Sequence, residues 1–256
     1  MYSMKKREKR QDSLHFKGKQ KFKSITSREA PFTYVEAFKI LRTNLEFASS
    51  TNNAKSILVT SALPDENKST VAINLALSLA ENRHSVILVE CDLRMPTFCD
   101  YLQLDKNTKG LSDILTSGMA LNECVIGLED LGISVIHAGT LPPNPSELLN
   151  QGRMKEIIEV LKRHYDYVIL DTPPVAVVTD AAVVGRMADG ALLVVRSRFT
   201  PGRTIRMAKQ HLEAVDVKVL GAVLTRYDGK TAGLRSAYHY KGYQNTYGQK
   251  RGWKKY

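Results

Sequence analysis

The sequence predicts an α/β domain with a doubly wound, mainly parallel sheet and helices on both faces of that sheet. Short apolar runs recur along the chain and are nearly continuous rather than alternating, as expected for strands buried on both faces. Stretches with helical periodicity separate them, and this alternation is the β-α-β pattern. The predicted strands are 57–60, 86–89, 167–170, 191–195 and 219–224, with a weaker candidate at 133–137, and the predicted helices between them are 69–81, 153–164, 179–188 and 203–214.

A further helix is predicted ahead of the first strand, because apolar residues recur at spacings of three and four between Tyr34 and Leu45. Thr33, followed three residues later by Glu36, has the spacing of a capping box and predicts the start of this helix. A short helix is also predicted to begin near Ser146, after the proline-rich turn at 142–145.

The composition restricts the class of protein. The chain has 256 residues, of which 43% are hydrophobic, enough for one domain of about 200 residues with a substantial core. No apolar stretch approaches the roughly 18–20 residues that span a bilayer, and the basic N-terminus lacks the apolar segment of a secretory signal. Cys91, Cys99 and Cys124 have no metal-type spacing, and so sparse a set fits a reducing compartment.

Charge divides the chain into three parts. The net charge is +11, with +8 in residues 1–28, +7 in residues 226–256 and −4 in the remainder. We therefore predict a flexible basic segment at 1–30, a folded domain at 31–225 and a basic tail at 226–256. Such tails either bind an anionic surface or simply stay solvated. Because no recognition helix or aromatic-basic groove is evident, no nucleic-acid partner is expected.

The segment SALPDENKST (61–70) lies between a predicted strand and a predicted helix, where a phosphate-binding loop is expected. In such a loop successive backbone N–H groups bind the anion, a lysine adds positive charge, and the next hydroxyl binds Mg²⁺. Lys68 and Ser69 take the last two positions. The strict pattern has glycines at the positions of Ala62 and Asn67. Asparagine is the non-glycine residue best able to adopt a positive φ, so the turn remains possible with some strain.

Acidic residues follow two of the predicted strands. Glu90 and Asp92 close one apolar run, and Asp171 closes another. In a doubly wound sheet, the carboxyl ends of the strands line the ligand crevice, and Mg²⁺ prefers one or two carboxylates plus phosphate oxygens. The sequence therefore predicts a site for ATP and Mg²⁺. A single aspartate at a strand end is also common as a helix cap or turn residue, so the prediction depends on the combination with the loop.

The last 21 residues carry five tyrosines without any apolar periodicity around them, which argues against a packing role. We interpret them as phosphate acceptors, because a flexible segment can reach into an active site. The predicted acceptors are Tyr238, Tyr240, Tyr243, Tyr247 and Tyr256.

With these motifs the chain resembles the bacterial tyrosine kinases (BY-kinases) of capsule and exopolysaccharide export, in the form in which the kinase is a separate cytoplasmic protein. The resemblance runs from about Phe32 to Thr225 and includes the tyrosine cluster. The loop at 61–70 resembles their Walker A motif, VILVECDLRMP (86–96) resembles Walker A′, and VILDTPP (168–174) resembles Walker B. Further family-like segments are GLSDIL (110–115), PPNPSELL (142–149), TDA (179–181) and EAFKILR (36–42).

The resemblance implies a role for each site residue. Lys68 and the loop backbone would hold the β- and γ-phosphates, and Ser69, Asp92 and Asp171 would bind Mg²⁺, the carboxylates directly or through water. Glu90 would help to position Mg²⁺ and the attacking tyrosine, and Arg94 would orient phosphate or a neighbouring subunit's tail. The implied catalytic residues are Lys68, Glu90, Asp92 and Asp171, and the implied nucleotide-binding residues are Pro64, Asp65, Glu66, Asn67, Lys68, Ser69, Thr70 and Arg94.

The resemblance also implies partners. EAFKILR is similar to the E-x-x-R-x-x-R element with which family members form ring-like homo-oligomers, so Glu36, Lys39 and Arg42 are the expected interface residues. Other expected partners are protein tyrosine substrates and a membrane-bound adaptor of the polysaccharide co-polymerase type. That adaptor would recruit the cytoplasmic chain to the inner face of the plasma membrane.

The chain departs from the family pattern at several positions. Asp65 and Asn67 replace two loop glycines, and Glu90 replaces an aspartate and is one methylene longer. Lys39 replaces the middle arginine of the oligomer element, and Thr225 replaces an asparagine that commonly meets the adenine edge.

Three functions remain open from the sequence. The first is an ATP-dependent protein-tyrosine kinase that phosphorylates the tail of a neighbouring subunit and regulates capsular or exopolysaccharide synthesis and export. The departures favour a second, a weak or inactive nucleotide-binding scaffold of the export machinery. The third is a partition-type P-loop ATPase, although such proteins carry a second lysine where this chain has Leu63.

Overall fold

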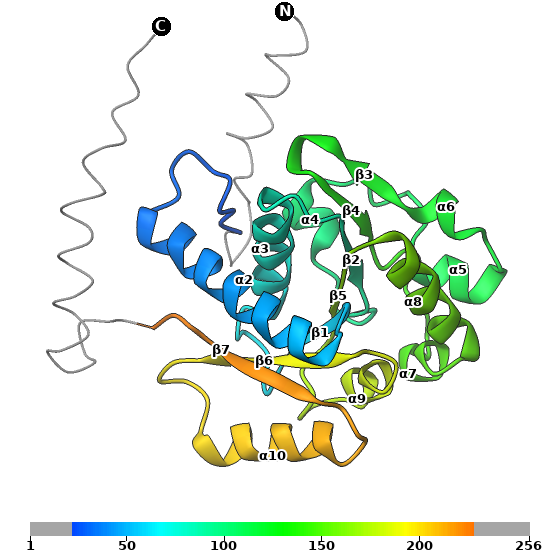
Figure 1. The fold of residues 1–256 in the computed structure, drawn as a ribbon. Helices are drawn as coiled ribbons and strands as arrows, with labels where there is room; N and C mark the ends of the chain where they lie inside the picture. The colour runs from blue at the N-terminus through cyan, green and yellow to red at the C-terminus, as the bar shows by residue number, and fades with distance from the viewer. Residues whose placement is uncertain (1–21, 228–256) are drawn as a thin grey trace, which may run out of the picture. The chain divides into compact units, whose positions relative to one another are not determined.

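The computed structural model describes residues 22–227 of the chain. Within them, seven strands form one sheet in the order β3-β4-β2-β5-β1-β6-β7 (Figure 1). Neighbouring strands are parallel except for β3 and β4, which are antiparallel. The strands are β1 (Ser56–Ser61), β2 (Val86–Glu90), β3 (Ile126–Leu128), β4 (Ile133–Ile136), β5 (Tyr167–Asp171), β6 (Gly190–Arg196) and β7 (Val219–Thr225).

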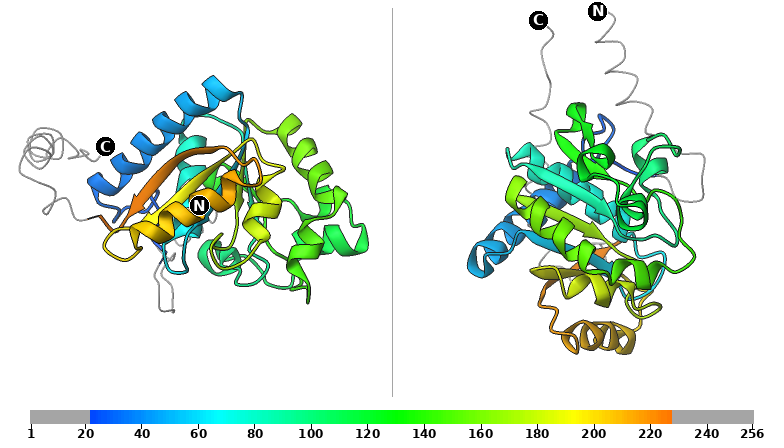
Figure 2. Two further views of the ribbon diagram at one scale, coloured as in Figure 1. Left: turned by 90° about the horizontal axis from the view of Figure 1, so that it is seen from below. Right: turned by 90° about the vertical axis from the view of Figure 1, so that its right-hand side faces the viewer.

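Helices cover both faces of this sheet, as Figures 1 and 2 show. One face carries α2 (Phe32–Asn52), α3 (Lys68–Glu81) and α4 (Phe98–Leu102). The other face carries α5 (Leu111–Ser117), α7 (Pro145–Leu149), α8 (Gly152–His164), α9 (Asp180–Gly185) and α10 (Gly202–Glu213). The short helix α6 (Leu121–Cys124) and the 3-10 turn η1 (Glu129–Leu131) flank strand β3.

Two hydrophobic cores result, one on each face of the sheet. Alternate residues of each central strand enter opposite cores: Leu58 of β1 packs with α8 and α9, whereas Ile57 and Val59 pack with α2 and α3. All three side chains are fully buried. Burial on both faces explains why the strands read as continuous apolar runs in the sequence. The predicted fold class is therefore confirmed.

The elements that sequence patterns missed are short. Strand β3 and helices α4, α5 and α6 have three to seven residues each, too few for a clear periodicity. The predicted capping box is wrong, because α2 begins at Phe32 with Pro31 at the N-cap and no side chain caps it. Thr33 lies inside the first turn, and Glu36 instead pairs with Lys39.

The predicted flexible segment 1–30 extends too far. Phe22 and Ile25 are buried in the core beneath α2 and α3. The Phe22 ring stacks on Tyr101 with centroids 5.1 Å apart, and the backbone N–H of Ile25 donates to Oδ1 of Asn74 at 2.7 Å. The basic composition of the segment predicts flexibility, but Phe22 and Ile25 belong to the hydrophobic core that α2 and α3 form on one face of the sheet.

Candidate functional site

The phosphate-loop residues connect β1 to α3, as the sequence predicts. Asp65 has φ 61° and Asn67 has φ 69°, so both residues adopt the left-handed conformation. These are the two positions at which the family pattern has glycine. A left-handed residue with a side chain is strained, and Asp and Asn tolerate the strain better than most. The loop therefore adopts the left-handed conformation at both positions without its usual glycines.

The loop side chains point in different directions. Pro64 and Asp65 are exposed and Asn67 and Thr70 are half-buried, whereas Glu66 is only 1% exposed. Glu66 accepts hydrogen bonds from the loop itself and from the end of β6. Its backbone oxygen accepts a bond of 2.9 Å from Oγ1 of Thr225, at the end of β7.

Lys68 joins the loop to both strand-end aspartates. Its Nζ lies 2.7 Å from Oδ2 of Asp92 and 3.7 Å from Oδ2 of Asp171. It also donates to Oγ of Ser69 at 3.2 Å. Burial alone would lower the pKa of Lys68, but the charges of Asp171 and Asp92 raise it, so the ammonium is held charged. The loop thus brings the lysine and the hydroxyl of Ser69 close to the two carboxylates.

Asp171 is fully buried, and neither of its carboxylate oxygens accepts a hydrogen bond from the described residues. The Nζ of Lys68 stands at ion-pair distance from Oδ2 of Asp171 rather than at hydrogen-bond distance. Burial raises the pKa of Asp171 to about 6, although the charge of Lys68 and the nearby side chain of Ser69 oppose the shift. A buried carboxylate without hydrogen bonds is costly in a folded protein, and it is a common sign of a ligand site.

Glu90 lies directly beside Asp171 in the parallel register of β2 and β5 and is also fully buried. Its environment is different. Oε1 accepts hydrogen bonds from the backbone N–H groups of Thr97 and Phe98, at 2.5 and 2.8 Å, and Oε2 accepts one from Ala138 at 3.1 Å. Burial raises the pKa of Glu90 to about 7 against the effect of these bonds. The carboxylate joins the loop after β2 to the loop after β4.

Arg94 brings three of the family-like segments together. Its Nε and Nη2 donate to the two oxygens of Asp180, at 2.8 and 3.0 Å, and Nη2 also donates to Oγ of Ser146 at 2.9 Å. Ser146 in turn donates to Asp180, which is fully buried. The sequence marked the segments of Ser146 and Asp180 as family-like but assigned neither residue a role. The Arg94 guanidinium is therefore engaged in holding loops together.

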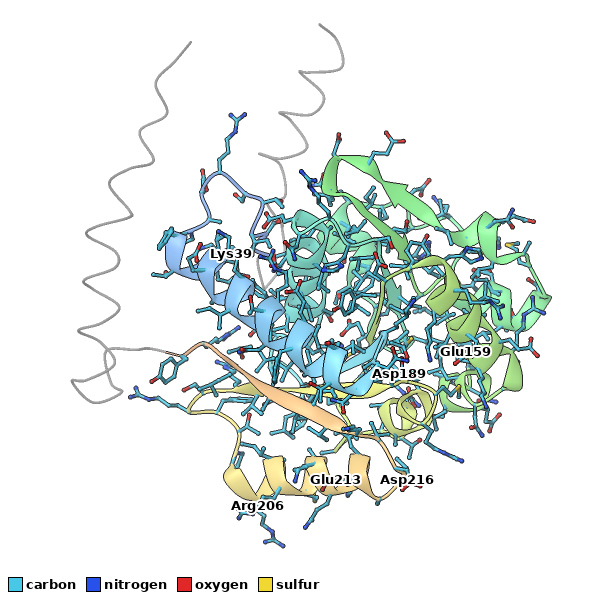
Figure 3. The ribbon with its side chains drawn as sticks, in the orientation of Figure 1. Lys39, Glu159, Asp189, Arg206, Glu213 and Asp216 are labelled. Atoms are coloured by element: carbon cyan, nitrogen blue, oxygen red, sulfur yellow. The ribbon has the colours of Figure 1, made fainter. Side chains whose placement is uncertain are left out.

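The predicted interface residues lie on α2, away from the loop in the chain. Lys39, labelled in Figure 3, pairs with Glu36 at 2.7 Å. Arg42 turns toward α3, where Nη1 donates to the backbone oxygen of Ser78 at 2.6 Å. This carbonyl is among the last four of α3, which have no partner within the helix. Arg42 thus stabilises the packing of α2 on α3.

Two further observations bear on the class of site. Among residues 22–227, no three or more histidine, cysteine or acidic side chains converge to form a protein-only metal site. Over the same range, none of the helices combines the length and the apolar character needed to cross a membrane. The five predicted acceptor tyrosines of the tail lie outside the described residues.

Comparison with known proteins agrees with this geometry. The AAA domain family matches residues 65–201. The tyrosine-protein kinase YwqD of Bacillus subtilis (strain 168) is 39% identical over 84% of this chain and 89% of its own length. The tyrosine-protein kinase etk of Escherichia coli (strain K12) is 37% identical over 80% of the chain, which spans 28% of that longer protein.

Solved structures with a similar fold include a tyrosine kinase domain. The kinase domain of the E. coli tyrosine kinase ETK superposes with a TM-score of 0.74 at 35% identity, covering 83% of this chain and 85% of that domain. The septum site-determining protein MinD from Pyrococcus horikoshii OT3, solved with Mg-ADP, has a TM-score of 0.60 at 21% identity over 75% of this chain and 76% of its own, and it shares the fold alone. The loop lysine lies between two aspartates that follow strands, and the relatives described above are tyrosine-protein kinases. The chain therefore belongs to the family of bacterial tyrosine kinases with a P-loop core.

Proposed function

We propose that this protein is an ATP-dependent protein-tyrosine kinase that phosphorylates the C-terminal tyrosines of a neighbouring copy and thereby regulates capsular or exopolysaccharide synthesis and export. The observation that carries the proposal is the charge arrangement around Lys68, which lies between Asp92 and the unbonded carboxylate of Asp171. The kinship with YwqD and etk supports the choice of tyrosine as acceptor.

The residues present fit ATP with Mg²⁺. Mg²⁺ is usually held by one or two carboxylates, a hydroxyl, waters and the substrate's own phosphates, rather than by an all-protein cage. The protein offers one hydroxyl, that of Ser69, and two carboxylates, those of Asp92 and Asp171. The oxygens of Asp171 have no competing hydrogen bond among the described residues. The backbone of residues 64–70 would hold the phosphates at the start of α3.

Each site residue then has a defined task. Mg-ATP, when bound, would supply the γ-phosphoryl group to a tyrosine oxygen, with ADP as the leaving group and release of the phenolic proton. Lys68 holds positive charge beside the phosphates, where negative charge accumulates as transfer proceeds. Asp92 and Asp171 would hold the metal ion. Glu90 acts through the backbone, since its three hydrogen bonds fix the loop on which Asp92 is carried.

Transfer to a neighbouring copy requires assembly, and we propose α2 as the surface for it. Besides Lys39 and Glu36, this helix exposes two large apolar side chains, Ile40 at 52% and Phe47 at 77%. Reversing the charge of Arg42 would be a poor test of this surface, because the Arg42 side chain also donates a hydrogen bond to α3. Lys39→Glu leaves the α3 contact intact and is expected to shift the protein toward monomer in light scattering. An unchanged mass distribution would contradict the assignment of this surface.

A membrane-bound adaptor of the polysaccharide co-polymerase type is the proposed activator. It would bring the cytoplasmic chain to the inner face of the membrane, where the basic segments can meet anionic lipid. The scaffold alternative is favoured by one observation, the strained left-handed Asp65 and Asn67 in the loop. The partition-type ATPase is disfavoured by Leu63 in place of a lysine.

The decisive experiment is phosphorylation of the purified full chain. The protein is incubated with Mg-ATP, with and without the cytoplasmic segment of the cognate adaptor, and the tail is analysed by mass spectrometry. We expect phosphate on several of the tyrosines at 238, 240, 243, 247 and 256. Nucleotide binding without any phosphotyrosine would favour the scaffold, and ATP hydrolysis without phosphotyrosine would favour the partition-type ATPase.

A further inference from the structure

Glu66 is an almost fully buried charged side chain of the phosphate loop, at 1% exposure. Its carboxylate accepts three hydrogen bonds. Oε2 accepts the backbone N–H of Leu63 at 2.6 Å, and Oε1 accepts the backbone N–H of Arg196 at 3.1 Å and the hydroxyl of Thr200. Leu63 belongs to the loop, whereas Arg196 and Thr200 belong to the end of β6 and the connection to α10. One carboxylate thus ties the loop to a segment about 130 residues away in the chain.

The backbone of Glu66 makes a second connection. Its carbonyl oxygen accepts the hydroxyl of Thr225 at the end of β7, at 2.9 Å. Glu66 is therefore bonded to the ends of both β6 and β7, which are neighbours in the sheet beyond β1. Glu66 thus connects the phosphate loop to the ends of two neighbouring strands.

The residues on either side of Glu66 explain why such fixing is needed. Asp65 and Asn67 are both left-handed, with φ 61° and 69°. For residues with a side chain this conformation is unfavourable, and it persists only where surrounding contacts determine it. The hydrogen bonds of Glu66, which lies between the two, are among the contacts that act on the loop in this conformation, together with the bond from Arg196 to the backbone oxygen of Asp65.

We propose that Glu66 is a positioning residue that holds the glycine-poor phosphate loop in its binding conformation, without itself touching the nucleotide. This inference deepens the proposed function, since it concerns the same nucleotide site. A carboxylate beside the phosphates would by charge alone weaken their binding. If Glu66 were only a negative charge near the phosphates, removing that charge should tighten ATP binding. If Glu66 holds the loop in its binding conformation, removing the charge should weaken ATP binding. The two readings differ in sign.

The test compares Glu66→Gln with Asp65→Asn, the adjacent loss of the same charge. Glutamine keeps the shape of Glu66, but its amide nitrogen cannot accept a hydrogen bond, so one donor loses its acceptor. Asp65→Asn keeps a residue that tolerates the left-handed conformation. Glu81→Gln, at the exposed end of α3, controls for a general effect of charge. Amide hydrogen exchange over residues 62–67 is measured on the nucleotide-free full chain, and ATP affinity by titration calorimetry.

We expect Glu66→Gln to speed exchange over residues 62–67 by at least about tenfold and to weaken ATP binding by about tenfold, the scale of one lost hydrogen bond to a charged group. Asp65→Asn should tighten ATP binding, and Glu81→Gln should change neither measurement. In the background Asp65→Gly with Asn67→Gly, where the strain is absent, Glu66→Gln should cost less than about threefold. A purely structural role would give the same loss in both backgrounds.

Unchanged exchange over 62–67 in Glu66→Gln, or ATP binding as tight as in the unmodified protein, would overturn the inference. An equal loss in the glycine background would also overturn it. The exchange measurement needs no nucleotide. If the unmodified protein bound no ATP, the proposed function would fail, and the exchange rates would still decide whether Glu66 holds the loop.

Discussion

Glu90 and Asp171 are neighbours at the ends of β2 and β5, and both are fully buried, yet they have opposite surroundings. Glu90 accepts three backbone hydrogen bonds, whereas Asp171 accepts none from the described residues. A carboxylate whose oxygens are all engaged holds the protein together, and one with vacant oxygens is available to a metal ion. We therefore propose that the same place in the fold provides a structural acid, Glu90, and a ligand-binding acid, Asp171, and that the bonds around each acid distinguish them.

The largest effect is expected for Lys68→Met, which removes the cation that pairs with Asp171 among the described residues. Tail phosphorylation should fall by at least about 10²–10³-fold, as for loss of one positioned electrostatic group. The change also leaves Asp92 and Asp171 buried without a cation, so the free energy of unfolding should drop by about 3 kcal/mol. Anti-phosphotyrosine blotting and urea unfolding measure the two effects. Activity within tenfold of the unmodified protein would remove Lys68 from the mechanism.

Asp171→Asn should separate activity from stability. We expect phosphorylation to fall by about 10²-fold because a metal ligand loses its charge. The nucleotide-free protein should be at least as stable as before, because the substitution removes a buried carboxylate without hydrogen bonds. Thermal unfolding without nucleotide, beside a kinase assay, checks this combination. A clear loss of stability would show that Asp171 is structural after all.

Glu90→Gln should give the reverse combination. The amide nitrogen of glutamine faces a backbone N–H on one side, so at least one of the three donors loses its acceptor. We expect the free energy of unfolding to fall by about 1–3 kcal/mol. Urea denaturation measures it, with Glu81→Gln as a matched control on the exposed end of α3. Stability equal to that of the control would contradict the role of Glu90 in joining the two loops.

The smallest effect concerns a third acid, Asp189 (Figure 3), at the opposite ends of the strands. Burial alone would raise its pKa, but Lys162 and the N–H groups of Ser56 and Lys55 hold the pKa of Asp189 below its ordinary value. A lowered pKa means that the folded state favours the ionised acid. Its contribution is therefore present above about pH 4, the ordinary value of an aspartate, and is lost as pH falls through the folded-state pKa.

Asp189→Asn should accordingly reduce stability at pH 7 and make little difference near pH 3. Because Asp189 is partly exposed, we expect a loss of about 1 kcal/mol or less at neutral pH. Chemical unfolding at both pH values checks the sign. A larger loss at the acid pH than at the neutral pH would contradict the assignment.

The sequence predicts the fold well because both faces of the sheet are buried, so each central strand appears as an apolar run. The sequence also predicts that the loop lysine lies close to Asp92 and Asp171, since the ends of adjacent parallel strands meet at one edge. The contact of Glu90 with Ala138, which follows β4, could not be predicted, because it joins residues far apart in the chain. The bonds from Arg94 to Asp180 and from Glu66 to Arg196 likewise join residues far apart in the chain.

The measurement that tests the account most directly is the Mg²⁺ dependence of nucleotide affinity at these two strand ends. ADP is titrated into the unmodified protein, Asp171→Asn and Glu90→Gln, with Mg²⁺ and with EDTA. We predict that Mg²⁺ strengthens binding to the unmodified protein and to Glu90→Gln, and that this gain is lost in Asp171→Asn. Retention of the gain in Asp171→Asn together with its loss in Glu90→Gln would contradict the account.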